Sequence, residues 1–287
     1  MRDVPNRQLS LLFAALLVSC AIARAADEDA AADLRAVKLR EAALASGRGD
    51  AAGWKKLGTD YACLVKKHPR DLATRDAYGD YLLGMNDRDG AMQQWLAAEK
   101  IDPGNFAILD HLAGTYLAMG EPKTSLGYYI RASDARPADA QTHFNAANVA
   151  CMFRHDLGTS EGEAFALALR HFSEAHRLAP KSADYARAYA ETFYLIDKPD
   201  WLAALKIWTD YLDLVPEKNF ALLNLARVQM KLGHADEARA CLSQVKGTEN
   251  ERLRARLSAR IDAEFPPDGK APSISPKPGI DEAGRVP

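Results

Sequence analysis

The side chains that could do chemistry at the shortest spacing are His171, Glu174 and His176. His171 and Glu174 are one helical turn apart, so they could meet one metal ion. His176 is five residues from His171 and, at about 100° per residue, points about 140° away from it. The sequence also contains neither a Gly-rich phosphate loop nor an HExxH zinc motif. We therefore predict that the protein is not an enzyme and has no catalytic residues, no metal site and no cofactor.

The cysteines outside the first 25 residues are Cys63, Cys151 and Cys241. All three fall in predicted helices, and none has the short paired spacing of metal sites. Free cysteine is often buried as a small hydrophobic residue, and we expect that role for each of them. Their odd number excludes a complete disulfide framework.

The composition is that of a soluble folded protein. Of the 287 residues, 48% are hydrophobic and 26% are charged, and the net charge is −2. Coating a nucleic acid duplex requires a concentrated excess of Lys and Arg, so we exclude nucleic acid as a partner.

One spacing of four, three and five residues recurs along the chain. It first joins Ala91, Trp95, Ala98 and Pro103. It returns at Ser125, Tyr129, Ala132 and Pro137, at Ala168, Phe172, Ala175 and Pro180, and at Ala204, Trp208, Tyr211 and Pro216. Residues four and three apart share one stripe of a helix, and proline cannot continue a helix because it lacks an N–H. The pattern therefore predicts a series of similar helices, each closed by a proline.

A small residue precedes each stripe, and its distance from the stripe locates the insertions. These residues are Gly79, Ala113, Ala147, Ala190 and Ala226. The prolines at 69, 103, 137, 180 and 216 are 34, 34, 43 and 36 residues apart. The first four small residues precede the first residue of their stripe by 12, 12, 21 and 14 positions. In both series the third value exceeds the first by nine residues and the fourth exceeds it by two. Each insertion therefore lies between the two helices of a pair.

With these residues the segment from Leu72 to Val245 resembles five tetratricopeptide repeats (TPRs), units of about 34 residues built as helix, turn, helix. The resemblance implies an all-α, right-handed α-solenoid. The small residues would let paired helices approach, and the aromatic residues would fill the space toward neighbouring helices. It also implies a peptide or protein ligand on the concave surface, which the first helices of the repeats line.

Polar residues beside each small residue of the first helices are the candidate partner-binding residues. They are Asp76, Asp80, Asp110, His111, Asn145, Asn148, Arg187, Glu191, Asn224 and Arg227. Asn145 and Asn224 stand where some TPR proteins use asparagine to bond a peptide backbone, and an amide both donates and accepts. The alternative is that these residues form an ordinary solvated polar face.

The third and fifth repeats depart from the pattern. The third carries an insertion at residues 154–163, where Ser160 and Glu163 predict a capping box that starts a longer second helix. The fifth has no closing proline and carries Leu242 where an aromatic residue might be expected.

The ends of the chain differ from the repeats. We expect a degenerate helical pair at 26–70, a TPR array at 71–247, a capping helix at 248–265 and a disordered Pro-rich tail at 266–287. Thr248 and Glu251 predict a capping box at the start of the capping helix.

Residues 1–25 read as a signal peptide, with Arg2 and Arg7 before an apolar run of about 15 residues. That run is shorter than the ~20 residues a membrane-spanning helix needs. Two cleavage chemistries stay open: cleavage after Ala25, or a lipobox-like cleavage that leaves Cys20 lipidated.

The resulting hypothesis is an exported, periplasmic or secreted, non-enzymatic scaffold that binds a peptide or partner protein. The alternative is a membrane assembly factor anchored through lipidated Cys20. An enzyme would need a site within the insertion 154–163.

We predict that the mature protein begins at Ala26 or at Cys20. Intact-mass measurement of the protein from its native cell checks this, and an added mass of diacylglycerol size would select the lipidated form. Retention of residues 1–19 would contradict export.

Overall fold

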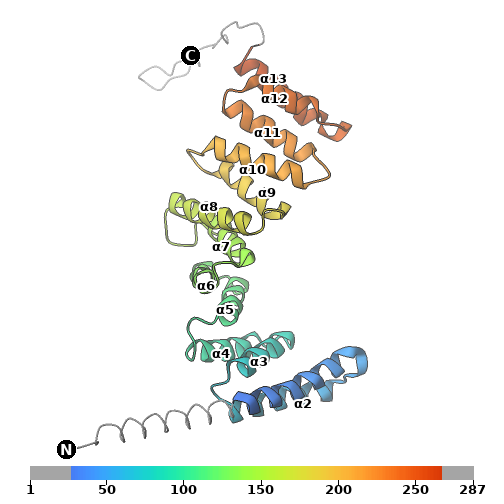
Figure 1. Cartoon of the computed structure of the whole chain (residues 1–287), viewed down its shortest axis with the longest axis vertical. Helices are drawn as coiled ribbons and strands as arrows, with labels where there is room; N and C mark the ends of the chain where they lie inside the picture. Colours follow the sequence, from blue (N-terminus) through green and yellow to red (C-terminus); the bar gives the residue numbers. More distant parts are fainter. Residues whose placement is uncertain (1–26, 267–287) are drawn as a thin grey trace, which may run out of the picture. The chain divides into compact units, whose positions relative to one another are not determined.

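The computed structural model describes residues 27–266, which form helices joined by short turns and loops and contain no strand (Figure 1). The all-α prediction is therefore confirmed. The predicted signal peptide and nearly all of the predicted tail lie outside the described residues. Within the described part, no helix is both long enough and apolar enough to cross a membrane.

The chain divides into two compact units, one up to Thr142 and one from His143. The described part of the first unit contains helical residues 27–43, a π-helical turn η1 (Leu44–Arg48), α2 (Ala51–Lys67), α3 (Leu72–Gly84), α4 (Arg88–Glu99), α5 (Phe106–Ala118), α6 (Pro122–Ala135) and the start of α7 (Ala140–Met152). The second unit contains the rest of α7, α8 (Glu161–Leu178), α9 (Ala183–Thr192), η2 (Phe193–Leu195), α10 (Trp201–Leu214), α11 (Asn219–Lys231), α12 (Ala235–Ser243), η3 (Thr248–Asn250) and α13 (Glu251–Glu264).

Helices that follow one another in the sequence pack as pairs. In the first unit α3 packs on α4 and α5 on α6, and in the second unit α11 packs on α12 (Figure 1). Ring contacts between Phe144 and Phe172 join α7 to α8. The helix, turn, helix unit expected from the repeated spacing is therefore present, with α3, α5, α7, α9 and α11 as its first helices.

The repeated stripe is the interior of these pairs. Ala91, Trp95 and Ala98 are each 0% exposed. The equivalent residues are all buried too: Ser125, Tyr129, Ala132, Ala168, Phe172, Ala175, Ala204, Trp208 and Tyr211. Proline follows two to four residues after each of the corresponding second helices. The phase assigned to the stripe is therefore correct.

Gly79 makes room for the Trp95 indole. A Cβ added at Gly79 would lie 2.5 Å from Trp95 Nε1 and 2.6 Å from Cε2, closer than non-bonded atoms approach. The small residue in this repeat thus accommodates the aromatic side chain of the second helix as well as its backbone. The position of the Trp95 indole therefore depends on glycine at position 79.

The turns inside three helix pairs share one backbone conformation. Asn86, Gly120 and Gly233 all have positive φ, at 63°, 78° and 81°. In each turn the next residue donates its N–H to a carbonyl five residues back, as Asp87 does to Leu82. This closes the first helix with a left-handed residue, for which glycine and asparagine carry the lowest strain.

Side-chain caps start most of the described helices. Asp71, Asp87 and Asp200 each accept a hydrogen bond from a backbone N–H in the first turn. The capping box between Ser160 and Glu163 is confirmed, with both hydrogen bonds present.

The capping box expected from Thr248 and Glu251 is wrong. Thr248 starts the short helix η3, and α13 begins at Glu251 without a side-chain cap. Thr248 lies in the 3-10 helix η3, so it does not stand at the N-cap position of α13.

The two ends of the described chain close the apolar interior. Leu34 and Val37 of residues 27–43 pack with Leu57 and Tyr61 of α2. At the other end Leu257 and Ile261 of α13 are buried in the cluster formed by α11 and α12. These contacts cover apolar faces that would otherwise meet water.

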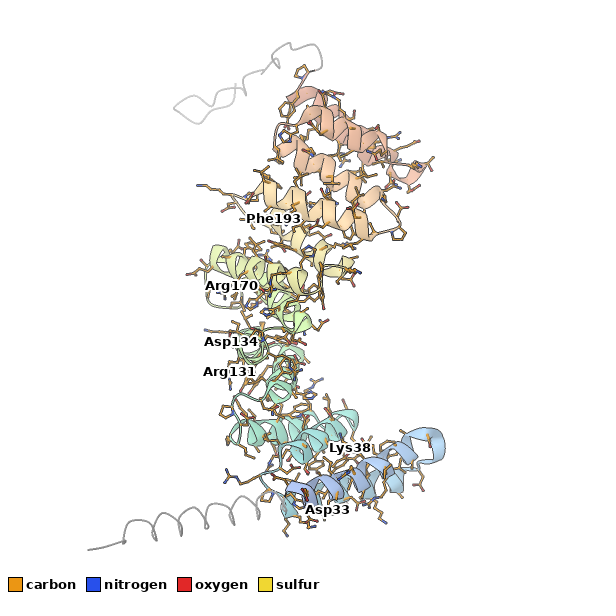
Figure 2. The ribbon with its side chains drawn as sticks, viewed as in Figure 1. Asp33, Lys38, Arg131, Asp134, Arg170 and Phe193 are labelled. Atoms are coloured by element: carbon orange, nitrogen blue, oxygen red, sulfur yellow. The ribbon has the colours of Figure 1, made fainter. Side chains whose placement is uncertain are left out.

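Charged side chains add bonds between second helices. Arg131, labelled in Figure 2, donates to Glu99 Oε1 at 2.6 Å and to the Pro103 carbonyl at 2.9 Å. Its guanidinium also lies 5.0 Å from the centre of the Tyr128 ring. Arg131 therefore links α6 to the C-terminal end of α4.

We predict opposite effects for two glycine substitutions. Gly79→Ala should destabilise the protein by about 1–3 kcal/mol, because its methyl group would overlap the Trp95 indole. Gly127→Ala should stabilise α6 by about 0.5–1 kcal/mol, because nothing lies within 4 Å of the added Cβ. Urea denaturation measures both. Equal effects would contradict the Gly79–Trp95 contact.

A second pair of variants tests the stripe in α10. Trp208 is fully buried, whereas Leu202 on the same helix is 64% exposed. Trp208→Ala should cost about 3–5 kcal/mol, and Leu202→Ala should stay within about 0.5 kcal/mol. Unchanged unfolding of the Trp208 variant would show that the stripe is not the interior.

Candidate functional site on the first helices

The ten candidate residues all lie on first helices, in five pairs. These are Asp76 and Asp80 on α3, Asp110 and His111 on α5, Asn145 and Asn148 on α7, Arg187 and Glu191 on α9, and Asn224 and Arg227 on α11. Because the chain forms two units, the face of α3 and α5 and the face of α9 and α11 are described separately.

In the first unit the structure brings Asp76, Asp80 and His111 together. His111 Nε2 lies 3.3 Å from Asp76 Oδ1 and 3.5 Å from Asp80 Oδ1. The imidazole stacks on the Trp95 indole with ring centres 4.7 Å apart and planes 2° from parallel. Trp95 Nε1 also donates to Asp76 Oδ1 at 3.2 Å. One cluster therefore joins α3, α4 and α5.

The Asp76 carboxyl is partly removed from water. Burial raises its pKa above the ordinary value, and the nearby Asp80 charge adds to this. Positive charge on His111 and the Trp95 hydrogen bond act in the opposite direction. A positively charged partner would therefore stabilise the ionised form of the Asp76 carboxyl, because burial penalises the unpaired anion.

Asp110 does not join that cluster but faces a neighbouring hollow. The hollow has a volume of about 260 Å³ and is lined in part by Arg88, Asp110 and Tyr129. Burial raises the pKa of the Asp110 carboxyl. It also raises the pKa of Tyr129 to about 12, with the Asp110 charge contributing. The face of the first unit thus presents several partly buried carboxylates.

On α7 the asparagines Asn145 and Asn148 are half-buried. The neighbouring His143, which sequence analysis did not select, is buried and places Nδ1 3.0 Å from Nδ1 of His171. The other two members of the metal hypothesis go elsewhere: Glu174 accepts from Arg177, and His176 pairs with Asp210. His171, Glu174 and His176 therefore do not form one site.

In the second unit Arg187 and Glu191 form an exposed pair on α9. Arg187 Nε donates to Glu191 Oε1 at 3.0 Å. The Arg187 guanidinium also lies 4.7 Å from the centre of the Phe220 ring of α11. Phe220 is 39% exposed, so an aromatic ring and a cation are accessible together on this face.

Asn224 does not offer the free amide that the sequence suggested. Its side chain is 3% exposed. Its Nδ2 donates to the Phe220 carbonyl at 2.9 Å, and its Oδ1 accepts from Arg227 Nη1 at 3.2 Å. The amide is engaged within α11, and it orients Arg227 instead of pointing toward a ligand.

The insertion 154–163 contains Ser160, whose neighbouring residues resemble a nucleophile motif of hydrolases. Gly158-Thr159-Ser160-Glu161-Gly162 matches the letters of the G-x-S-x-G nucleophile motif. That motif requires a strand before the serine, but here Ser160 follows turn residues and caps α8. Its Oγ is held by Glu163, so this serine has a structural role.

The three cysteines differ in exposure. Cys151 and Cys241 are partly buried, and burial raises the pKa of both thiols. Cys63 is exposed, so the expectation of a buried role is wrong for it. Cys63 precedes the buried Leu64 and lines a hollow between α2 and residues 27–43, beside Val37 and Asp60.

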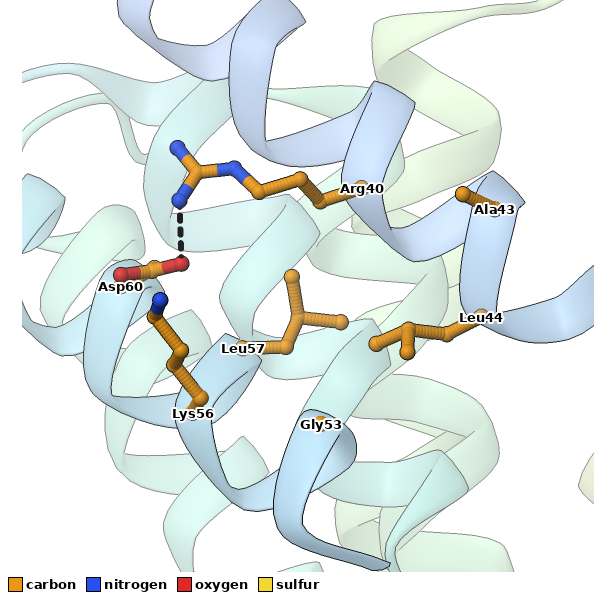
Figure 3. A pocket seen from close by; sticks show the side chains of 7 residues that line it. All are labelled: Arg40, Ala43, Leu44, Gly53, Lys56, Leu57 and Asp60. Atoms are coloured by element: carbon orange, nitrogen blue, oxygen red, sulfur yellow. Dashed lines mark hydrogen bonds and ion pairs between the residues drawn. The ribbon is translucent and has the colours of Figure 1, made fainter. Parts of the chain in front are cut away.

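A further cavity, which sequence analysis did not indicate, lies between residues 27–43, η1 and α2 (Figure 3). It has a volume of about 260 Å³. Leu44 and Leu57 give it apolar walls, and Arg40 pairs with Asp60 at 2.5 Å. These residues are too far apart in the sequence for a local motif to reveal the cavity.

A second group of carboxylates and a histidine lies in the same region. Asp33, labelled in Figure 2, accepts from Lys67 Nζ at 2.6 Å and lies 2.9 Å from His68 Nε2. Lys67 Nζ is also 3.1 Å from Asp29. The lysine ammonium already pairs with both carboxylates.

Several solved structures, TPR proteins among them, have a similar arrangement of helices. YrrB, described as a TPR protein with an unusual peptide-binding site, matches with a TM-score of 0.56 and 12% identity over 69% of this chain and 97% of its own. Pseudomonas aeruginosa PilF matches with a TM-score of 0.50 and 15% identity over 83% of this chain and 99% of its own. A chain of the Naa15/Naa10 structure bound to HypK-THB gives a TM-score of 0.61 and 16% identity over 82% of this chain and 34% of that chain.

At these identities the likeness shows the fold, and the TPR fold expected from the repeats is confirmed. No family model and no curated protein matches the sequence.

We predict that iodoacetamide labels Cys63 well before Cys151 and Cys241. Burial limits access to the two partly buried thiols and lowers the fraction present as thiolate, which is the reactive form. Peptide mass spectrometry of the folded protein after timed quenching measures the order. Equal rates would contradict the burial of α7 and α12 at these positions.

Proposed function

We propose that this protein is a non-enzymatic scaffold that binds a peptide or partner protein on its first helices. The observation that carries the proposal is the concentration of partly buried charged groups on α3 and α5 of a TPR fold. Asp76 and Asp110 are carboxyls whose pKa burial raises. Holding such groups away from water is costly unless they meet a positive partner, and a ligand side chain supplies one.

The two units suit different groups of a ligand. The carboxylates of α3 and α5 suit lysine or arginine side chains. Arg187 and Arg227 suit carboxylates, because a guanidinium binds them through two parallel hydrogen bonds. Phe220 beside Arg187 adds an apolar contact. Asn145 and Asn148 remain candidates for bonds to a peptide backbone, whereas the buried amide of Asn224 does not.

YrrB supports the class of ligand, since its description names a peptide-binding site in a TPR protein. The proposed compartment is the periplasm or the cell exterior, on the basis of residues 1–25. A lipid anchor on Cys20 is the alternative placement, and it would leave the partner-binding face unchanged.

A photo-crosslinking experiment in the native cell tests the face directly. A crosslinking amino acid is placed singly at Asp80 and at Arg187, both on first helices. Lys206 on α10 and Gln93 on α4 are the matched positions, because both are exposed on second helices. We expect the same partner to be captured from Asp80 or Arg187, and not from Lys206 or Gln93.

Circular dichroism of each labelled protein controls for folding. Capture of that partner only from the second helices would move the binding surface to the opposite face. Absence of any protein adduct from all four folded variants would contradict the scaffold function.

A further inference from the structure

We propose that Asp76, Asp80 and His111 form a binding site for a divalent transition metal ion, with Zn²⁺ as the best match. Their ligand atoms, two carboxylate oxygens and one imidazole nitrogen, all lie within 4.8 Å of one another. The ion would bind at carboxylates that the proposed function also offers to a basic side chain of the ligand, but Zn²⁺ binding is measured without any partner and is therefore tested independently of the scaffold function. The proposed site also reverses the sequence-based expectation of no metal site, which considered only histidines close in sequence.

The nitrogen to oxygen distances within the cluster are longer than those of a charge-assisted hydrogen bond. A hydrogen bond between a charged imidazole and a carboxylate is typically about 2.7–2.9 Å long. Here Nε2 lies 3.3 Å from one oxygen and 3.5 Å from the other. One Nε2 carries at most one proton, so it cannot donate to both carboxylates equally well.

The same distances suit two oxygens and one nitrogen around a common ion. Zn²⁺ binds imidazole nitrogen and carboxylate oxygen at about 2.0–2.2 Å, usually with tetrahedral geometry. The edge of such a tetrahedron is about 3.3–3.6 Å, by geometry from those bond lengths. The distances from His111 Nε2 to Asp76 Oδ1 and to Asp80 Oδ1 both fall in this interval.

The protein also fixes the orientation of the ligands. Asp76 and Asp80 are one turn apart on α3 and so share a face. Stacking on Trp95 holds the plane of the His111 ring, and the Trp95 N–H holds Asp76 Oδ1. Partners that orient metal ligands in this way are a regular feature of metal sites.

The ligand set and its exposure narrow the choice of ion. Imidazole favours Zn²⁺ and its neighbours over Mg²⁺ or Ca²⁺, which prefer all-oxygen sites. The side chains of Asp76, Asp80 and His111 are 28%, 54% and 32% exposed, so an ion could enter from solvent and keep water as a fourth ligand.

The group around Asp33 provides an internal contrast. There Lys67 Nζ already lies between Asp29 and Asp33, 3.1 and 2.6 Å from their oxygens. A metal ion would have to displace this ammonium. At Asp76 no lysine holds the carboxylate in this way: apart from His111 itself, the cation that acts on Asp76 is Lys38, through its charge alone.

The test is isothermal titration of ZnCl₂ into the full chain without a histidine tag, together with Asp80→Asn, His111→Ala and His155→Ala. We expect one Zn²⁺ per wild-type chain. Asp80→Asn and His111→Ala should each weaken binding at least tenfold. His155→Ala should bind as wild type, because exposed His155 pairs with a single carboxylate, Glu161. Asp80→Asn keeps the result interpretable if loss of the stacked His111 ring disturbs folding.

Co²⁺ adds a readout that depends on position. An ion on His111 would lie next to Trp95 and quench its fluorescence, and Asp80→Asn should remove most of that quenching. Absence of Zn²⁺ binding by the wild-type protein would overturn the proposal. The proposal would also be overturned if His155→Ala weakened Zn²⁺ binding as much as His111→Ala does. The same holds if His68→Ala abolished Zn²⁺ binding while Asp80→Asn bound Zn²⁺ as the wild type does.

Discussion

The contact between an aromatic residue on a second helix and a small residue on its first helix is the interaction on which the rest of the structure depends. At Gly79 the indole of Trp95 occupies the space where a Cβ would stand. A single helix pair of this size buries too little apolar surface to be stable alone, so each pair needs its neighbours. The aromatic stripe supplies that surface, and proline then redirects the chain into the next pair.

This packing also determines which residues remain for function. The stripe uses one side of each second helix, and the first helices keep polar side chains beside their small residues. Trp95 shows how closely the two roles are linked, because its buried ring packs on Gly79 while its N–H and face hold Asp76 and His111. The geometry of the cluster on α3 and α5 therefore follows from the packing of the repeat.

The fold could be predicted from the sequence because the spacing of four, three and five residues occurs four times and a fifth repeat keeps part of it. Spacing of small residues, aromatics and prolines depends only on helix periodicity, which is a local property. The candidate site could be predicted only in part. The sequence placed Asp76, Asp80 and His111 on the correct helices, but the distance between α3 and α5 follows from side-chain packing over more than thirty positions.

The incorrect or missing predictions arise because side-chain contacts depend on the three-dimensional packing and not on local spacing. Asn224 was expected to face a ligand, yet its amide bonds within α11 because the neighbouring Arg227 and the Phe220 carbonyl lie within reach. Cys63 was expected to be buried, but it lies one position off the buried side of α2. His143 and His171 are 28 residues apart, so no short motif could join them.

Hydrogen exchange of Trp95→Ala, read by mass spectrometry, tests the central claim that stability is built from local contacts between neighbouring helices. In a repeat protein, loss of one contact opens the adjacent helices first. We expect faster exchange in α3, α4 and α5 and wild-type rates in α9 to α12. Uniformly faster exchange across the described chain would contradict this account, because it would show one cooperative core in place of a series of paired helices.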